Sequence, residues 1–196
     1  MSLLIGKQAK ILSPREIIQV LAHVKTQRYS ERNEVMVLLS LKAGLRAKEI
    51  SLVTWSMVTD ASRQIGEVLH LPDHSSKGQS GRIIPLNKEL KKSLINLYQL
   101  VSPEPNQYII TSERGARMLP CNISHWFKNI FKALRLEGCS SHSGRRTFIT
   151  NAARRIIEVG GSLRDVQQLA GHTSLHMTQK YIEGDTQAKR KVIDLI

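Results

Sequence analysis

The chain has 196 residues, 41% of them hydrophobic and 23% charged, which is typical of a folded globular protein and excludes a largely disordered one. Lys and Arg total 29 against 16 Asp and Glu, and the formal net charge of +13 favours a polyanionic partner, nucleic acid above all. Two cysteines exclude a disulfide framework, and the chain has neither the ~18 apolar residues of a membrane span nor a signal-peptide core. We therefore expect a cytoplasmic protein with no membrane partner.

The first third of the chain is predicted to be helical. Ser13-Pro14-Arg15-Glu16 is typical of a helix start, because serine is a good cap, proline fits the first turn and glutamate completes a capping box. A second helix is expected over residues 30–43, where Gly44 would end it, and a short one over 47–52. The pattern then changes to strands at 66–71 and 82–86, which flank the turn-rich stretch 73–81. Residues 55–58 are a candidate edge strand.

The remainder is again predicted to be helical, over residues 88–100, 122–136, 143–158, 162–170 and 174–181. The apolar stripe of the second of these helices indicates core rather than a surface for base stacking. The fold class is therefore mainly α with a small antiparallel β-sheet, an α+β fold. We expect a single domain over 13–184, an N-terminal extension over 1–12, and a C-terminal tail over 185–196.

Basic charge is concentrated in one part of the chain. Residues 111–155 carry nine basic and two acidic groups, which is more than half of the whole excess. Such a distribution is expected if one surface follows a phosphate backbone, although a solvated basic face would give the same count.

Common catalytic motifs are missing. The sequence has no phosphate-binding loop, no GxGxxG and no HExxH, and GxxG at 78–81 is more typical of a hairpin turn. His172 and His176 are four residues apart, yet no nearby Cys or carboxylate completes a ligand set, so no metal and no other cofactor are expected.

A series of short motifs remains, and each of them is weak alone. An arginine follows a glycine break, a lysine lies in the turn between the strands, His and Arg are three apart, and a tyrosine follows a Gly-His pair by nine residues. These are Gly44-Leu45-Arg46-Ala47-Lys48-Glu49, Lys77, His142-Ser143-Gly144-Arg145, Gly171-His172 and Tyr181.

In order and spacing these motifs resemble those of the tyrosine recombinases, the family of phage integrases and DNA invertases. The resemblance runs from about residue 12 to the end of the chain. It implies the catalytic-domain fold of that family and an enzyme that cleaves and rejoins DNA through a 3′-phosphotyrosyl intermediate, without metal or ATP. The implied function is site-specific recombination of mobile DNA, as an integrase or an invertase.

The resemblance also implies a role for each motif residue. Tyr181 would be the nucleophile, and Arg46 and Arg145 would bind the two non-bridging phosphate oxygens with planar, permanently charged forks. His142 would accept the phenolic proton, because a phenol of pKa near ~10 is mostly protonated at pH 7. His172 would donate a hydrogen bond to a phosphate oxygen.

The departing 5′ oxygen needs a proton, and Lys77 is the implied donor. Glu49 is expected to orient its surroundings rather than react. Arg82, which could share the role of Lys77, is a candidate DNA contact, as are Lys128 and Arg146.

Each of these residues also has an ordinary structural interpretation. Tyr181 could be a core or surface tyrosine, and Arg46 could pair with Glu49. His142 could simply begin a helix, and His172 could follow a helix end.

The sequence departs from the family pattern in two ways. Gly144 stands where the family usually has leucine, which costs helix propensity and a packing contact. The catalytic pattern also begins close to Met1, so no separate core-binding domain is expected. The chain could be a natural short protein, like the invertases of fimbrial phase variation, or an isolated catalytic domain. Weaker DNA binding would follow.

The expected partner is double-stranded DNA, with four protomers on two sites as the active assembly and an accessory DNA-bending protein or partner recombinase as a further candidate. The apolar tail residues Val192, Ile193, Leu195 and Ile196 could dock on a neighbouring protomer or on their own core. Two rival functions are a type IB topoisomerase-like relaxation of DNA and a non-catalytic DNA-binding accessory or regulatory protein. All of these functions would place the protein at the nucleoid.

Overall fold

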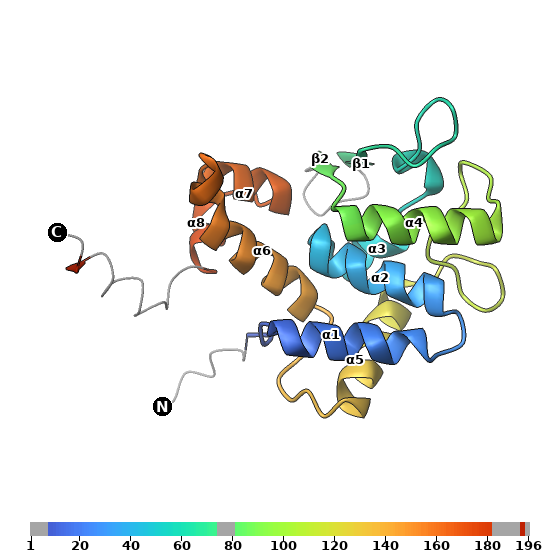
Figure 1. Cartoon of the computed structure of the whole chain (residues 1–196), viewed down its shortest axis with the longest axis horizontal. Helices are drawn as coiled ribbons and strands as arrows, with labels where there is room; N and C mark the ends of the chain where they lie inside the picture. The colour runs from blue at the N-terminus through green and yellow to red at the C-terminus, as the bar shows by residue number, and fades with distance from the viewer. Residues whose placement is uncertain (1–7, 74–80, 182–192, 195–196) are drawn as a thin grey trace.

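The computed structural model describes residues 8–73, 81–181 and 193–194, and over them the chain is mainly helical with one two-stranded antiparallel sheet (Figure 1). This confirms the predicted fold class. The helices are α1 (Pro14–Lys25), α2 (Ser30–Lys42), α3 (Ala47–Leu52), α4 (Lys88–Val101), α5 (Pro120–Ala133), α6 (Ser143–Arg155), α7 (Leu163–Ala170) and α8 (Leu175–Gln179), and the strands are β1 (Val68–Leu71) and β2 (Arg82–Pro85).

Local signals place the first helix where the sequence predicts it. Ser13 is the N-cap of α1, its hydroxyl accepts from the Glu16 N–H, and the Glu16 carboxylate accepts from the Ser13 N–H at 2.8 Å. The next helix, α2, is buried from Val35 to Leu41 because α1, α4 and α6 pack around it. It is therefore the centre of the main hydrophobic core.

The candidate edge strand at 55–58 is wrong. Residues Trp55–Met57 form a 3-10 helix, and the Trp55 ring turns into the core, where it is 1% exposed and meets Tyr98 edge-to-face at 5.2 Å. Burial of a large aromatic ring outweighs the β-propensity of this short segment. Isolated bridges form only on either side of this segment, between Thr54 and Tyr108 and between Thr59 and Ile65.

A second, smaller hydrophobic cluster joins α6 to α7. It is made of Ile149, Ala153, Val166 and Ala170, against which Phe148 and Tyr181 pack. In Figure 1, α6, α7 and α8 stand together at one end of the molecule, away from α4 and the far ends of α1 and α2. The helix expected over 143–158 ends at Arg155 and continues as a 3-10 helix, Ile156–Val159.

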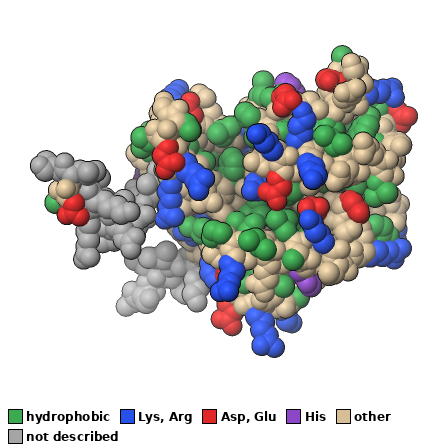
Figure 2. Space-filling model, in the orientation of Figure 1, with side chains coloured by type: hydrophobic (Ala, Val, Ile, Leu, Met, Phe, Trp, Pro, Cys, Tyr) green, Lys and Arg blue, Asp and Glu red, His purple; other side chains and the backbone are tan. Residues whose placement is uncertain are grey.

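Charges of both signs are interspersed over the face that carries α1, α2 and α4 (Figure 2). The basic excess is thus not gathered on that face. Among the helices of the described residues, none combines the length and the apolar character that crossing a membrane requires.

Gly144 allows the close approach of α6 to α2. A Cβ built at this position would overlap Ser40 Oγ and lie 2.9 Å from Ser40 Cβ. Glycine at this position, where the family usually has leucine, therefore leaves the space that the Ser40 side chain occupies. Ser40 already occupies the space that a side chain at this position would fill.

We predict that Gly144→Ala lowers the free energy of unfolding by ~1–3 kcal/mol, as overpacking does, although alanine favours an isolated helix by ~1 kcal/mol. Urea unfolding of Gly144→Ala, Ser40→Gly and the double variant measures it. Ser40→Gly removes both side-chain atoms that the new Cβ would approach. In the Ser40→Gly background, Gly144→Ala should therefore cost much less free energy of unfolding than it does in the wild type. Simple additivity of the two changes would contradict the steric explanation.

Candidate active site

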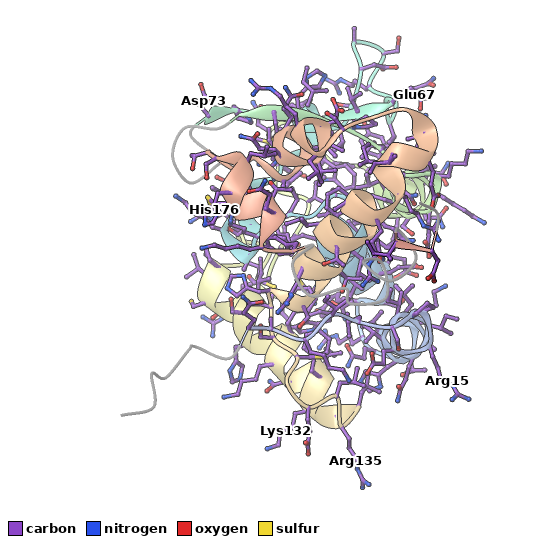
Figure 3. All side chains as sticks on the ribbon, turned by 90° about the vertical axis from the view of Figure 1, so that its left-hand side faces the viewer. Arg15, Glu67, Asp73, Lys132, Arg135 and His176 are labelled. Atoms are coloured by element: carbon purple, nitrogen blue, oxygen red, sulfur yellow. The ribbon has the colours of Figure 1, made fainter. Side chains whose placement is uncertain are left out.

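A cavity of about 740 Å³ opens beside the N-termini of α3 and α6 and the segment that joins α7 to α8. Figure 3 turns this end of the molecule, with α6, α7 and α8, toward the viewer. Five of the six predicted catalytic residues line the cavity, although they are spread over more than 130 positions of sequence. They are Arg46, His142, Arg145, His172 and Tyr181.

The Gly44 turn brings Arg46 to this cavity. Gly44 has a left-handed backbone (φ 65°), and a Cβ there would overlap the ring of Phe148, so only glycine fits the turn. Arg46 is the N-cap of α3, and its N–H donates to the Glu49 carboxylate at 2.7 Å. Its guanidinium Nη1 lies 3.3 Å from the same carboxylate and remains partly exposed.

Arg145 lies in the first turn of α6 and is almost completely buried, with 4% of its side chain exposed. Nη1 donates to the Gly44 carbonyl and Nη2 to the Ala170 carbonyl, both at 2.6 Å. These two bonds link the turn before α3 to the end of α7. They also fix the plane of the guanidinium, as binding of a tetrahedral anion requires.

Burial, followed by the nearby charge of Arg46, lowers the pKa of Arg145 to about 10, while Glu49 opposes the shift. The guanidinium is therefore still protonated at pH 7. For Glu49, burial acts to raise the pKa, but the hydrogen bond and charge of Arg82 outweigh it, so the pKa stays below its usual value. The cavity thus has a permanent cationic field around one ionised carboxylate.

His172 and Tyr181 form another part of the cavity wall. Gly171 ends α7 in a left-handed conformation, and His172 follows directly. The His172 Nδ1 lies 2.9 Å from the hydroxyl of Thr178, a buried residue of α8. The rings of His172 and Tyr181 are stacked, with centroids 5.6 Å apart and planes at 24°. Helix α8 therefore places both the partner of the histidine and, two residues after its end, the tyrosine.

His172 is 6% exposed, and this burial, with the charge of Arg145 next, lowers its pKa to about 4. The imidazole is therefore neutral at pH 7. If Nδ1 accepts from the Thr178 hydroxyl, Nε2 carries the proton and can donate it to an anion in the cavity.

We predict that this histidine makes the protein acid-sensitive. Because the folded pKa lies below the ordinary 6.5, the unfolded chain binds the proton first, and stability falls as pH drops from about 6.5 toward 4. The loss attributable to His172 is up to about 3 kcal/mol. Urea unfolding across this range should give a shallower pH dependence for His172→Gln than for the wild type. The matched substitution of the exposed His125 is the control, and equal slopes in wild type and His172→Gln would contradict the prediction.

The other predicted residues lie as follows. His142 is exposed at the start of α6 on the rim of the cavity, and Lys77 lies outside the described residues. Lys128 is exposed on α5 but does not line the cavity. Arg146 does line it, and its Nη1 donates to the Ala9 carbonyl at 2.8 Å. Arg82, expected to contact DNA, is instead buried, with 5% of its side chain exposed and an ion pair to Glu49.

Two parts of the site were not predicted. Thr178 has no sequence signal other than its place three residues before the tyrosine. The sequence predicts that residues 8–12 belong to an N-terminal extension, yet Gln8 and Ala9 line the cavity, and the Leu12 N–H donates to the Thr147 hydroxyl at 2.9 Å. Thr178 lies in a helix too short to carry a motif, and residues 8–12 reach the cavity through contacts with residues far away in the sequence.

Comparison with protein families identifies the chain. A family model described as the phage integrase family matches residues 10–188, which is most of the sequence. The chain belongs to the phage integrase family. The resemblance drawn from the motifs is thereby confirmed.

Among curated relatives in this family, tyrosine recombinase XerC of Proteus mirabilis is 30% identical over 168 residues, covering 84% of this chain and 52% of the relative. XerC of Rickettsia prowazekii (strain Madrid E) is 30% identical over 160 residues, covering 78% of this chain and 47% of the relative. The chain thus spans about half the length of the curated relatives it matches.

Solved structures of the family share the fold. The crystal structure of XerA recombinase superposes with a TM-score of 0.74 at 23% identity, over 96% of this chain and 65% of the other. XerH site-specific recombinase bound to a palindromic difH substrate gives 0.73 at 18% identity, over 96% and 53%.

Proposed function

We propose that this chain is a DNA-cleaving and DNA-rejoining catalytic domain of a site-specific recombinase, with Tyr181 as its nucleophile. The observation that carries the proposal is that the Tyr181 ring is stacked on His172 in a cavity that also holds the guanidinium groups of Arg46 and Arg145. The names of the relatives, tyrosine recombinases among them, agree with this assignment.

The cationic groups suit the transition state of phosphoryl transfer. Attack on a phosphodiester builds negative charge on two non-bridging oxygens, and Arg46 and Arg145 supply two planar forks for them. Three arginines surround Glu49, so a net positive charge is left for the phosphate. Arg145 is held by two backbone carbonyls and need not reorganise during the reaction.

The reaction can be written with its atoms balanced. The Tyr181 phenol oxygen forms a bond to phosphorus, the bond from phosphorus to the 5′ oxygen breaks, and the phenolic proton passes to a base. We assign acceptance of that proton to His142, which is exposed at the cavity rim, and a hydrogen bond to a phosphate oxygen to the neutral His172. Lys77 would protonate the leaving oxygen. The new 3′-phosphotyrosyl bond keeps the energy of the phosphodiester, so rejoining is the reverse of the same step.

Double-stranded DNA is the proposed partner, in keeping with a relative described in complex with transposon right end DNA. Two sequential strand exchanges need four active sites, so four protomers on two DNA sites are the proposed assembly. The tail residues 185–196 that could link protomers lie almost entirely outside the described residues, and their docking stays a prediction. In a cell, such a protein would act on DNA in the cytoplasm.

The proposal is tested by covalent capture. The protein is incubated in EDTA with a pool of nicked suicide duplexes that have a randomised core, and adducts are isolated on a denaturing gel. We expect an adduct whose DNA-linked peptide contains Tyr181. Absence of any adduct would overturn the proposal. With a duplex recovered from the pool, formation of recombinant junctions favours the recombinase, whereas relaxation of supercoiled DNA alone would favour the topoisomerase-like activity.

A further inference from the structure

The Glu49 carboxylate is buried beside Arg46 and Arg145, two arginines that line the cavity, and 1% of its side chain is exposed. One oxygen, Oε2, accepts the Arg46 N–H at 2.7 Å and lies 3.9 Å from Arg145 Nη1. The other, Oε1, is shared by Arg46 Nη1 at 3.3 Å and Arg82 Nη1 at 2.8 Å. Arg82 is thus the nearest side-chain cation to the carboxylate, and it comes from a different part of the chain.

Arg82 connects three segments that carry site residues. It is the first residue of β2 and follows Lys77 by five positions in the sequence. Its Nη1 binds Glu49 in α3, and its Nε donates to the Leu169 carbonyl at 2.8 Å in the last turn of α7. Three residues after that carbonyl comes His172. One side chain therefore links β2 to α3, which begins after Arg46, and to the last turn of α7, which precedes His172.

The end of α7 is shaped around this guanidinium. Gly171 is left-handed (φ 60°), and a Cβ there would lie 2.7 Å from Arg82 Nη1. The glycine of the Gly-His pair is therefore needed for two reasons, backbone conformation and the space that Arg82 occupies.

Burial argues against direct contact of Arg82 with DNA. Its side chain is 5% exposed, and its Nη2 is enclosed without a hydrogen bond to any described residue. A buried donor left unpaired costs ~1–3 kcal/mol, so this part of the Arg82 side chain lowers the stability of the fold rather than raising it. Arg82 does not line the cavity, but it bonds Glu49 and the Leu169 carbonyl, which in turn lie next to residues that do.

We propose that Arg82 is a positioning residue that acts through Glu49 and the end of α7 to hold Arg46, Arg145 and His172 in their catalytic arrangement. The proposal rests on the function proposed above. Without Arg82, Oε1 would keep only the 3.3 Å contact with Arg46, and the carboxylate would draw the Arg46 guanidinium away from the cavity. Cleavage would then slow while DNA affinity, which depends on exposed cations, stays the same.

The test is a double-mutant cycle on the single-turnover rate of adduct formation, using one duplex recovered by covalent capture and a temperature at which every variant is folded. We expect Arg82→Gln to lower the rate by ~30–100-fold, within the range of lost transition-state donors, and to change the DNA Kd by less than about threefold. Arg82→Lys keeps the charge but cannot reach both Glu49 and Leu169, so an intermediate loss of ~5–10-fold is expected. Arg63→Gln removes an exposed arginine and is the charge control.

Coupling separates positioning from the other roles. If Arg82 acts through Glu49, Arg82→Gln combined with Glu49→Gln should be no slower than the slower single variant. Multiplying rate losses would overturn the proposal, as would an unchanged rate in Arg82→Gln. If Arg82→Gln instead weakens DNA binding, and the number of ions released on binding falls by about one, Arg82 contacts a phosphate. If the wild type forms no adduct, the proposed function fails, whereas a reactive wild type with unaffected Arg82 variants overturns positioning alone. Should Arg82→Gln not fold, Arg82→Lys and its cycle with Glu49→Gln decide by the same criteria.

Discussion

Replacing Tyr181 with phenylalanine is expected to abolish the covalent adduct with DNA completely. The substitution removes only the phenolic oxygen, so no bond to phosphorus can form, and no other described tyrosine lines the cavity. The ring keeps its stacking on His172 and its packing against the α6–α7 cluster, so the melting temperature should hardly change. Adduct formation is followed on a denaturing gel with the duplex recovered by covalent capture, and binding is followed by a mobility shift.

Tyr98→Phe is the matched control, because it removes a hydroxyl from a half-buried tyrosine of α4 that does not line the cavity. It should form the adduct at the wild-type rate. An adduct in Tyr181→Phe would assign the nucleophile to another residue and remove the mechanistic basis of the proposed function. Retained DNA binding with no adduct is the result that supports it.

Local sequence signals were sufficient for most of the fold. The capping box at Ser13 and Glu16 sets the start of α1, and Gly171 sets the end of α7, because each signal acts within one helical turn. The short helix over 47–52 was predicted with its observed bounds. Trp55 shows where this reasoning fails. The 3-10 turn there exists because the core accepts its ring, and no local pattern reports the shape of the core.

The candidate site divides in the same way. The spacing of the motif residues predicts which chemical groups are present, and the fold then brings five of them to one cavity. The partners that hold those groups could not be read from spacing, because they are pairs distant in sequence: Gly144 with Ser40, Arg145 with the carbonyls of Gly44 and Ala170, and Arg82 with Glu49. From the sequence alone, Arg82 is predicted to be an exposed cation of a strand, because its contact with Glu49 is visible only in the folded chain.

Arg145→Lys is expected to lower the rate of adduct formation by ~10²–10³-fold, the loss of ~3–4 kcal/mol typical of one transition-state donor. Lysine keeps one positive charge but has no planar fork, so it cannot bind both the Gly44 and Ala170 carbonyls and still face a phosphate oxygen. The DNA Kd should change by only a few fold, because Arg145 is one buried cation in a strongly basic chain. Single-turnover gels and mobility shifts measure the two quantities separately.

Arg135→Lys provides the matched control, because Arg135 is exposed and projects from the end of α5 (Figure 3). It should react like the wild type. Arg145→Ala is expected to lose stability as well, by ~3–5 kcal/mol, since it leaves two buried carbonyls without donors and Glu49 with one cation fewer. An Arg145→Lys variant that cleaves at the wild-type rate would mean that the buried guanidinium is a structural link between α3 and α7 only. The transition state would then depend on Arg46, the more exposed of the two arginines.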